Sequence, residues 1–237
     1  MKNTLRELRE RVYEANIALV KHGLVILTWG NASEIERETG IFAIKPSGVP
    51  YEELRPEHVV LVDMEGQVVD SSLRPSSDTP THLVLYQEFE EIGGIVHTHS
   101  RYATAWAQAM RPLPCFGTTH ADAFYGAVPC TRPLTDEEIA GDYERNTGLV
   151  IVETFHRLNI NPDHMPAVLV AQHAPFTWGK DAATAVENAV TLEEVSAMAL
   201  WTLIAQEAWQ NLPPVSQSLL DKHFWRKHGE GAYYGQK

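Results

Sequence analysis

Cysteine is scarce in this chain. Only Cys115 and Cys130 occur among the 237 residues, and they are too far apart to form a CxxC pair. Closed structural zinc sites are usually built from cysteines, so that class of site is not expected here. Lone cysteines are also typical of a reducing compartment. The first residues have the pattern of an amphipathic helix rather than an apolar signal segment, so we expect a cytoplasmic protein.

Positive charge is also in short supply. Lysine and arginine total 19 against 31 acidic residues, which gives a net charge of -12. This balance argues against nucleic acid or an anionic membrane as a partner. An anionic substrate would therefore need a local group of donors. The longest apolar stretch, residues 182–209, contains several glutamates, so it indicates a long helix rather than a membrane span.

The sequence lacks a linker as well. No Gly/Ser/Pro-rich stretch or internal repeat divides it, so residues 1–237 are expected to form a single domain. Helical and strand patterns are mixed along the chain, which favours an α/β fold. Strands are predicted at 24–28 and 40–45, and as a hairpin at 59–63 and 67–70. A helix is predicted from Asp78 to about Phe89, and a helical stretch from Thr135 to Leu158 with a break near Gly148.

Two histidines one residue apart are the most informative feature that is present. His97 and His99 end a β-branched segment that begins at Gly94. Residues i and i+2 of a strand leave the same face, so both imidazoles should point at one place. Such a pair suits a divalent cation such as zinc, although a hydrogen-bonded histidine pair at a strand edge would give the same pattern.

A third histidine follows another apolar segment. Residues 167–171 have the composition of a buried strand, and His173 stands at its end, before Pro175. On its own, His173 would more often be a core or turn histidine than a metal ligand. Together, three imidazoles at strand ends and no cysteine cluster favour a catalytic zinc site with an open position.

Three short polar loops lie at predicted strand–helix junctions, where hydroxyls, backbone N–H groups and one lysine could bind an anion. They are Trp29-Gly30-Asn31, Lys45-Pro46-Ser47-Gly48 and Pro75-Ser76-Ser77-Asp78. By itself, each loop is more often an ordinary turn, and the anion site requires all three to converge.

Two further polar segments are candidates for acid–base chemistry. Asp122, in Thr118-Thr119-His120-Ala121-Asp122, could transfer a proton or simply end a helix. Tyr233 and Tyr234 stand in a glycine-rich tail, where paired tyrosines suggest docking, for example against a neighbouring subunit.

Taken in order, these segments resemble the class II aldolase and epimerase family over nearly the whole chain. The resemblance is greatest to members that invert C4 of a pentulose 5-phosphate, and it rests on the polar loops, the HxH strand, the Asp122 segment and the tyrosine tail. It implies a three-layer α/β/α fold with a mostly antiparallel central sheet. It also implies a homotetramer with active sites between subunits, one Zn²⁺ per subunit and a pentulose phosphate substrate.

The resemblance also assigns roles by position. It places His97, His99 and His173 on the metal, with Asp78 as an acidic residue beside it. Asp122 and Tyr234 match the acid/base pair, which would serve a neighbouring subunit's zinc. The substrate and phosphate positions match Gly30, Asn31, Lys45, Ser47, Gly48, Ser76 and Ser77, and further residues lining the site match Thr118, Glu144 and His223.

Three other functions remain open at this stage. The first is a true aldolase of the same family, although such enzymes commonly carry glutamate at the position of Asp78. The second is a non-catalytic scaffold like the adducin head, but such modules lose metal ligands that this chain keeps. The third is a zinc hydrolase, for which the sequence offers no H-E-x-x-H helix.

Overall fold

A seven-stranded sheet forms the centre of the protein. The computed structural model describes residues 2–206, 212–229 and 232, and the strand order in the sheet is β4-β3-β2-β1-β5-β7-β6. Every neighbouring pair is antiparallel. The strands are β1 (Asn31–Glu36), β2 (Ile41–Ile44), β3 (Val60–Asp63), β4 (Val68–Asp70), β5 (Gly94–His97), β6 (Ala167–Leu169) and β7 (Pro175–Gly179).

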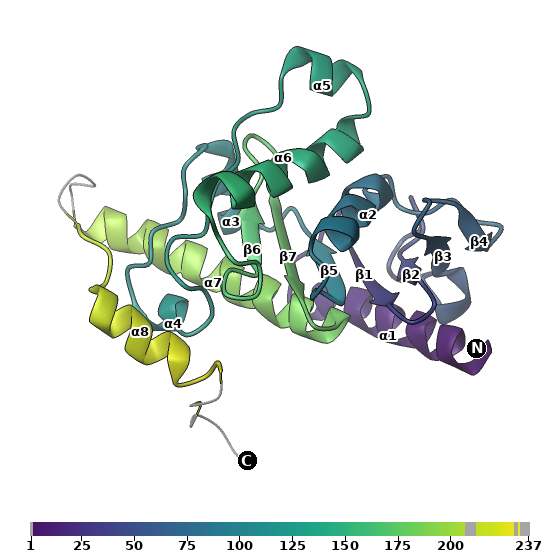
Figure 1. Ribbon diagram of the computed structural model, residues 1–237, viewed down its shortest axis with the longest axis horizontal. Coiled ribbons are helices and arrows are strands. Elements are labelled where there is room, and N and C mark those ends of the chain that lie inside the picture. The colour runs from purple at the N-terminus through teal and green to yellow at the C-terminus, as the bar shows by residue number, and fades with distance from the viewer. Residues whose placement is uncertain (1, 207–211, 230–231, 233–237) are drawn as a thin grey trace.

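Helices cover both faces of this sheet (Figure 1). Helices α2 and α6 pack together on one face, while α1 and α7 contact the strands from the other. The helices are α1 (Lys2–Lys21), α2 (Thr79–Glu88), α3 (Arg101–Gln108), α4 (Thr118–Ala121), α5 (Asp136–Ala140), α6 (Tyr143–Leu158), α7 (Ala182–Ala205) and α8 (Gln217–Trp225), with a short 3-10 turn at Pro56–His58. The expected three-layer α/β/α fold with an antiparallel sheet is therefore confirmed.

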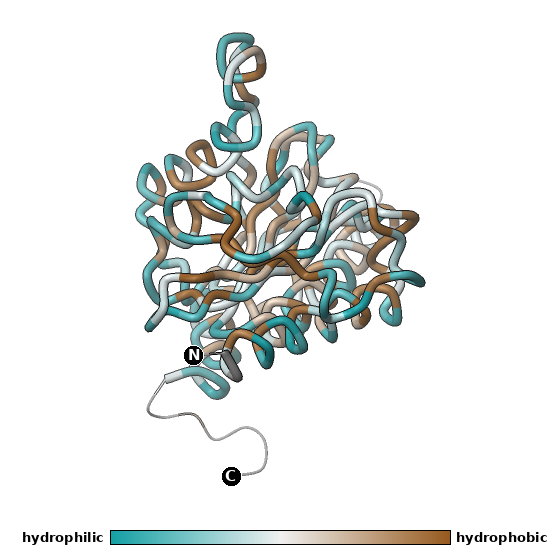
Figure 2. The backbone as a smooth tube through the Cα atoms, turned by 90° about the vertical axis from the view of Figure 1, so that its right-hand side faces the viewer, coloured by the Kyte–Doolittle hydropathy of each residue, from teal (hydrophilic) through white to brown (hydrophobic). Residues whose placement is uncertain are grey.

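The alternation of side chains along β5 explains why this strand packs against helices on both faces of the sheet and also carries a histidine of the candidate site. Ile95 joins the core beneath α2 and α6, whereas Val96 packs with α1 and α7 on the other face. Since side chains alternate along a strand, His97 returns to the face of Ile95. Figure 2 shows this arrangement as hydrophobic segments through the middle of the molecule, with hydrophilic segments concentrated at its outside. None of the described helices is long and apolar enough to span a membrane.

The predicted strand at residues 24–28 is wrong. Residues 24–26 are irregular, residues 27–28 form a turn, and the strand begins only at Asn31. Leu27 has a φ of 57° and Gly30 a φ of 85°, values that no strand can accommodate. A Cβ on Gly30 would lie 2.8 Å from the backbone oxygen of His97, so glycine is required where this loop presses against β5.

The predicted helix break near Gly148 is also wrong. The interruption falls at Gly141 and Asp142, between α5 and α6, and Gly148 lies inside α6. A Cβ at Gly148 would come within 2.7 Å of the Val84 Cβ on α2. This glycine therefore serves the close packing of two helices rather than a turn. The capping box formed by Thr135 and Glu138 at the start of α5 is present as predicted.

The segment around His173 differs from its prediction in length. Strand β6 ends at Leu169, and the chain then turns and returns as β7, a strand that the sequence did not reveal. His173 therefore lies in the turn of a hairpin. Gln172, with a φ of 60°, reverses the chain there, and its N–H donates to the Ala107 carbonyl at 2.9 Å.

Candidate metal centre and sugar-phosphate pocket

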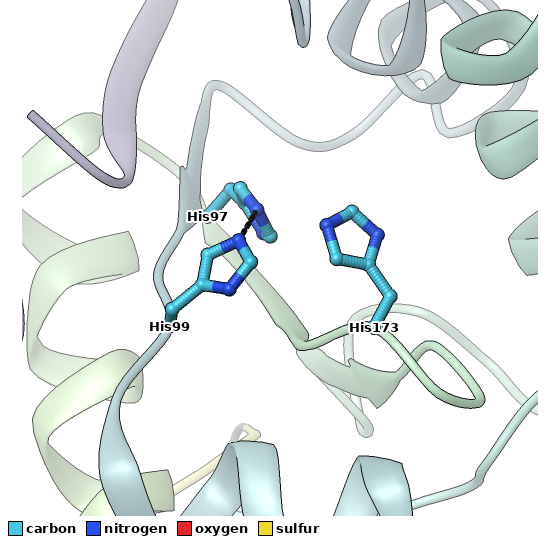
Figure 3. A group of neighbouring side chains, drawn as sticks. All are labelled: His97, His99 and His173. Atoms are coloured by element: carbon cyan, nitrogen blue, oxygen red, sulfur yellow. Dashed lines mark hydrogen bonds between the residues drawn. The ribbon is translucent and has the colours of Figure 1, made fainter.

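Three imidazoles converge at the end of β5 (Figure 3). The ring centroids of His97 and His99 are 4.9 Å apart, those of His97 and His173 5.0 Å, and those of His99 and His173 5.2 Å. One nitrogen from each ring lies within 4.8 Å of the others. The convergence predicted from the HxH spacing and from His173 is thus present, with two rings coming from β5 and its extension and one from the β6–β7 turn.

The surroundings of these rings keep them neutral. Burial, reinforced by the neighbouring His99, lowers the pKa of His97 to about 3. Burial, with His97 and His99 nearby, lowers the pKa of His173 to about 3 as well, and burial also lowers the pKa of His99. Neutral imidazole is the form that coordinates a metal, so no proton has to be displaced from these rings at neutral pH.

The orientation of His97 favours metal binding too. Its Nδ1 donates to the Pro175 carbonyl oxygen at 2.9 Å, which leaves the Nε2 lone pair facing His99 Nε2 at 3.1 Å. A backbone carbonyl that fixes the tautomer in this way is the usual second partner of a metal-bound histidine. His173 Nδ1 is buried and has no hydrogen-bond partner within the described protein. The donor set therefore fits a divalent ion such as zinc.

Asp78 lies in the same pocket but outside the group of converging ligand atoms. It occupies the N-cap position of α2, yet its side chain makes no capping hydrogen bond. Instead, Asp78 Oδ2 accepts a hydrogen bond from Asn31 Nδ2 at 2.6 Å. The carboxylate is thus held beside the histidines by the start of β1, and Asn31 Oδ1 is left buried without a partner among the described residues.

The three polar loops do converge, and direct hydrogen bonds join them. Asn31 Nδ2 donates to Ser76 Oγ at 3.1 Å, Ser76 N–H to the Lys45 carbonyl at 3.0 Å, and Ser47 N–H to the Arg74 carbonyl at 3.0 Å. Because the backbone N–H groups of Ser47 and Ser76 are engaged in this way, they do not supply the anion donors that the loops suggested. Those donors would have to be side-chain hydroxyls and other N–H groups.

Lys45 contributes a buried positive charge at the edge of these loops. Its Nζ donates to the Val49 carbonyl at 2.7 Å and lies 4.7 Å from the centre of the Tyr51 ring. Burial lowers the pKa of Lys45 to about 8. The Tyr51 hydroxyl donates in turn to the Gly30 carbonyl at 2.9 Å. One aromatic side chain therefore supports both the lysine and the loop before β1.

A pocket of about 530 Å³ unites these parts, a volume within the range of small-molecule sites. Four residues of its wall were not singled out from the sequence as site residues. Thr28, Trp29 and Pro46 belong to, or adjoin, loops already recognised, and Tyr143 precedes Glu144 at the start of α6. The predicted residues that line it are Gly30, Asn31, Lys45, Ser47, Gly48, Ser76, Ser77, Asp78, His97, His99, Glu144 and His173.

Asp122 belongs to a second cluster, between α4 and α8. Its carboxylate accepts hydrogen bonds from Arg226 Nη2 at 2.8 Å and from His223 Nδ1 at 2.9 Å, and Lys227 Nζ lies 3.3 Å away. Burial alone would raise the pKa of Asp122, but hydrogen bonds from Arg226, His223 and Lys227 outweigh it and hold the pKa below its usual range. Asp122 is therefore an ionised carboxylate at neutral pH.

This second cluster is separate from the histidine pocket within one chain. Asp122, Thr118 and His223 do not line the pocket, although Asp122 and His223 contact each other. The remaining member of the predicted acid/base pair, Tyr234, lies outside the residues that the structure describes. Among the residues that the structure describes, the histidine pocket therefore contains neither member of the predicted acid/base pair.

An antiparallel sheet between helical layers, with a three-histidine centre beside hydroxyl-rich loops, defines the class of protein. Residues 10–200 match the family described as the Class II Aldolase and Adducin N-terminal domain. The chain belongs to this family. A curated relative, the "L-ribulose-5-phosphate 4-epimerase UlaF" of Salmonella paratyphi A, is 54% identical over 233 residues, which are 98% of this chain and 100% of that protein. The protein of the same name from Salmonella typhi is equally similar.

Solved structures agree on the fold. An "L-fuculose 1-phosphate aldolase" superposes with a TM-score of 0.72 at 24% identity, covering 93% of this chain and 95% of that one. The L-fuculose 1-phosphate aldolase from Glaciozyma antarctica PI12 gives a TM-score of 0.74 at 21% identity and covers 96% of this chain and 84% of its own. At this identity the likeness concerns architecture alone.

Proposed function

We propose that this protein is a zinc-dependent epimerase that converts L-ribulose 5-phosphate into D-xylulose 5-phosphate by inverting C4. The observation that carries the proposal is the three-histidine centre, which shares one pocket with the serine loops and Lys45. The 54% identity to a full-length relative with the corresponding name supports the choice of substrate. The separate Asp122 cluster supports the choice of reaction, because inversion needs an additional proton-transfer group.

Inversion at C4 cannot proceed by simple deprotonation, since C4 is not adjacent to the C2 carbonyl. Breaking the C3–C4 bond solves this problem. A base removes the C4 hydroxyl proton, C4 becomes the aldehyde of glycolaldehyde phosphate, and the bonding electrons form an enediolate over C2 and C3. The aldehyde then turns, C3 attacks its opposite face, and an acid returns a proton to the C4 oxygen.

Each step of this reaction can be assigned to residues of the pocket or of a neighbouring subunit. A divalent ion held by His97, His99 and His173 would supply Lewis-acid stabilisation of negative charge on oxygen. Ser47, Ser76 and Lys45 would bind the phosphate and keep the aldehyde anchored. Asp122 and Tyr234, contributed by a neighbouring subunit, would exchange protons with the C4 oxygen from opposite sides.

Product analysis tests the proposal directly. Metal-loaded protein supplied with L-ribulose 5-phosphate should form D-xylulose 5-phosphate, which a coupled assay or NMR can quantify. Accumulation of glycolaldehyde phosphate and dihydroxyacetone instead would identify an aldolase. No turnover by the fully metal-loaded protein would favour a non-catalytic member of the family.

A homotetramer with active sites between subunits follows from the same proposal. His97 lies in the pocket of one chain, and Tyr234 would complete the pocket of another, so the two residues can be disabled on different subunits. Mixed tetramers of His97→Asn and Tyr234→Phe chains should regain part of the activity that each lacks alone, because some sites receive both intact halves. Hybrids separated by charge tags should be assayed beside each parent. Verified hybrids without activity would place the whole site within one subunit.

Lys45 gives the proposed phosphate site a pH dependence. A lysine whose pKa is lowered to about 8 is charged below that pH and loses its charge as the pH rises through it. The KM for L-ribulose 5-phosphate should therefore rise above pH 8, by up to about tenfold per pH unit. The matched variant is Lys45→Arg, because a guanidinium stays charged. The KM of this variant should exceed that of the wild type at pH 7 but should not change between pH 7 and 9.5. If its KM still rose above pH 8, another group would be responsible for the titration.

Two broader features complete the proposal. The family match covers residues 10–200, and we propose that the remaining residues belong to the same single domain, 1–237. We also place the protein in the cytoplasm, which agrees with Cys115 and Cys130 both being free.

A further inference from the structure

One large aromatic side chain in the wall of the histidine pocket is exposed. Trp29 lines the pocket, and 52% of the residue remains exposed. Its indole lies 6.4 Å from the His99 ring, centroid to centroid, with the two planes tilted by 55°. On another side of the three-histidine centre, the Tyr143 ring lies 6.2 Å from that of His173. Two aromatic rings thus flank the histidines, and Trp29 is the more exposed.

The backbone that carries Trp29 is held firmly against the metal centre. The Trp29 N–H donates to the Ile26 carbonyl at 3.1 Å, and its own carbonyl accepts from the Tyr51 hydroxyl at 3.4 Å. The next residue, Gly30, packs against the backbone of His97 without room for a Cβ. Because this backbone is constrained, packing the exposed indole against a ligand would cost little backbone entropy.

We propose that Trp29 retains the aldehyde fragment of the substrate between bond cleavage and bond re-formation. The inference rests on the proposed epimerase function and concerns what distinguishes an epimerase from an aldolase. After the C3–C4 bond breaks, the aldehyde group of glycolaldehyde phosphate must rotate to present its opposite face to C3, and the fragment must not leave the pocket. The serine loops and Lys45 can hold its phosphate, whereas the aldehyde end is uncharged and needs a steric barrier.

An indole beside His99 is suited to form that barrier. At 6.4 Å from the His99 ring, it would cover the space next to the metal centre without offering an acid or base that could react with the enediolate. Covering this space also excludes water, which could otherwise protonate C3 and convert the enediolate into free dihydroxyacetone. Release of both fragments is therefore the side reaction that Trp29 suppresses.

The test is the ratio of released fragments to epimerised product. In Trp29→Ala, the ratio of released glycolaldehyde phosphate and dihydroxyacetone to D-xylulose 5-phosphate should be at least roughly tenfold higher than in the wild type, in line with the loss of a large apolar contact. Trp29→Phe, which keeps an aromatic face, should restore most of the wild-type ratio. Leu27→Ala is the matched control, because Leu27 is 72% exposed on the same loop but does not line the pocket.

Metal content and thermal stability of all variants should match the wild type, which separates retention from damage to the site. An unchanged product ratio in Trp29→Ala, with metal retained, would overturn the inference. The same is true if Leu27→Ala released as much fragment as Trp29→Ala. A wild-type protein that itself released only fragments would instead overturn the proposed epimerase function, so the two failures have different signatures.

Discussion

Replacing His97 with asparagine should remove most of the bound metal and nearly all activity while leaving the chain folded. His97 is the innermost of the three imidazoles, with 1% of its surface exposed. Changing only a supporting group around a metal typically weakens affinity about 10–100-fold, and removing a ligand should cost at least as much. Elemental analysis after dialysis against a limiting amount of chelator measures the loss directly.

The stability of this variant should change little. A chain of 237 residues can build a core that does not depend on an ion, and the cores beneath both helical layers are made of aliphatic and aromatic side chains. His156→Asn is a suitable control, since His156 is an exposed residue of α6. This variant should retain the metal content of the wild type. A His97→Asn protein with full metal content would remove this residue from the metal centre.

Loss of either proposed proton-transfer group should abolish most epimerisation without affecting the metal. General acids and bases are typically worth ~10²–10⁴-fold, so Asp122→Asn and Tyr234→Phe should each lower kcat by about that order. Asp221→Asn offers a matched control on α8, the helix that carries His223, because Asp221 hydrogen-bonds Tyr125 rather than joining the Asp122 cluster. Steady-state kinetics with product analysis is the appropriate measurement.

The two variants should differ in the products that they leave. Cleavage of the C3–C4 bond needs a proton acceptor on one side only, whereas inversion also needs a proton donor on the opposite side. One variant is therefore expected to release glycolaldehyde phosphate and dihydroxyacetone while failing to invert C4. Near-normal epimerisation by both would exclude Asp122 and Tyr234 from the mechanism and would make the aldolase alternative the better one.

The local parts of the site were predictable because short-range geometry determines them. The i, i+2 spacing of His97 and His99 places both rings together as soon as the segment is extended. Likewise, the capping box at Thr135 appears in the structure because its two hydrogen bonds involve residues only three apart. Such features need no information about distant segments.

Features that depend on distant contacts could not be predicted in the same way. Residues 24–28 have an apolar, strand-like composition, but contact between Gly30 and the backbone of His97 imposes a turn. Tyr143 enters the pocket only because α6 packs on α2, and nothing in its neighbouring residues indicates this. The convergence of the three polar loops likewise depends on hydrogen bonds between segments more than 25 residues apart.

The β6–β7 hairpin has a consequence for how an ion would enter and leave. Its turn contributes His173, and the first residue of β7, Pro175, contributes the carbonyl that orients His97. Gln172 and Ala171 tie this turn to the end of α3 and to the Thr131 hydroxyl. If this hairpin opened locally, His173 would move away from the ion. At the same time, His97 would lose the carbonyl that fixes its tautomer. Metal exchange would then follow the opening rate of this hairpin, so that the residence time of the ion becomes a property of backbone hydrogen bonds rather than of the imidazoles alone.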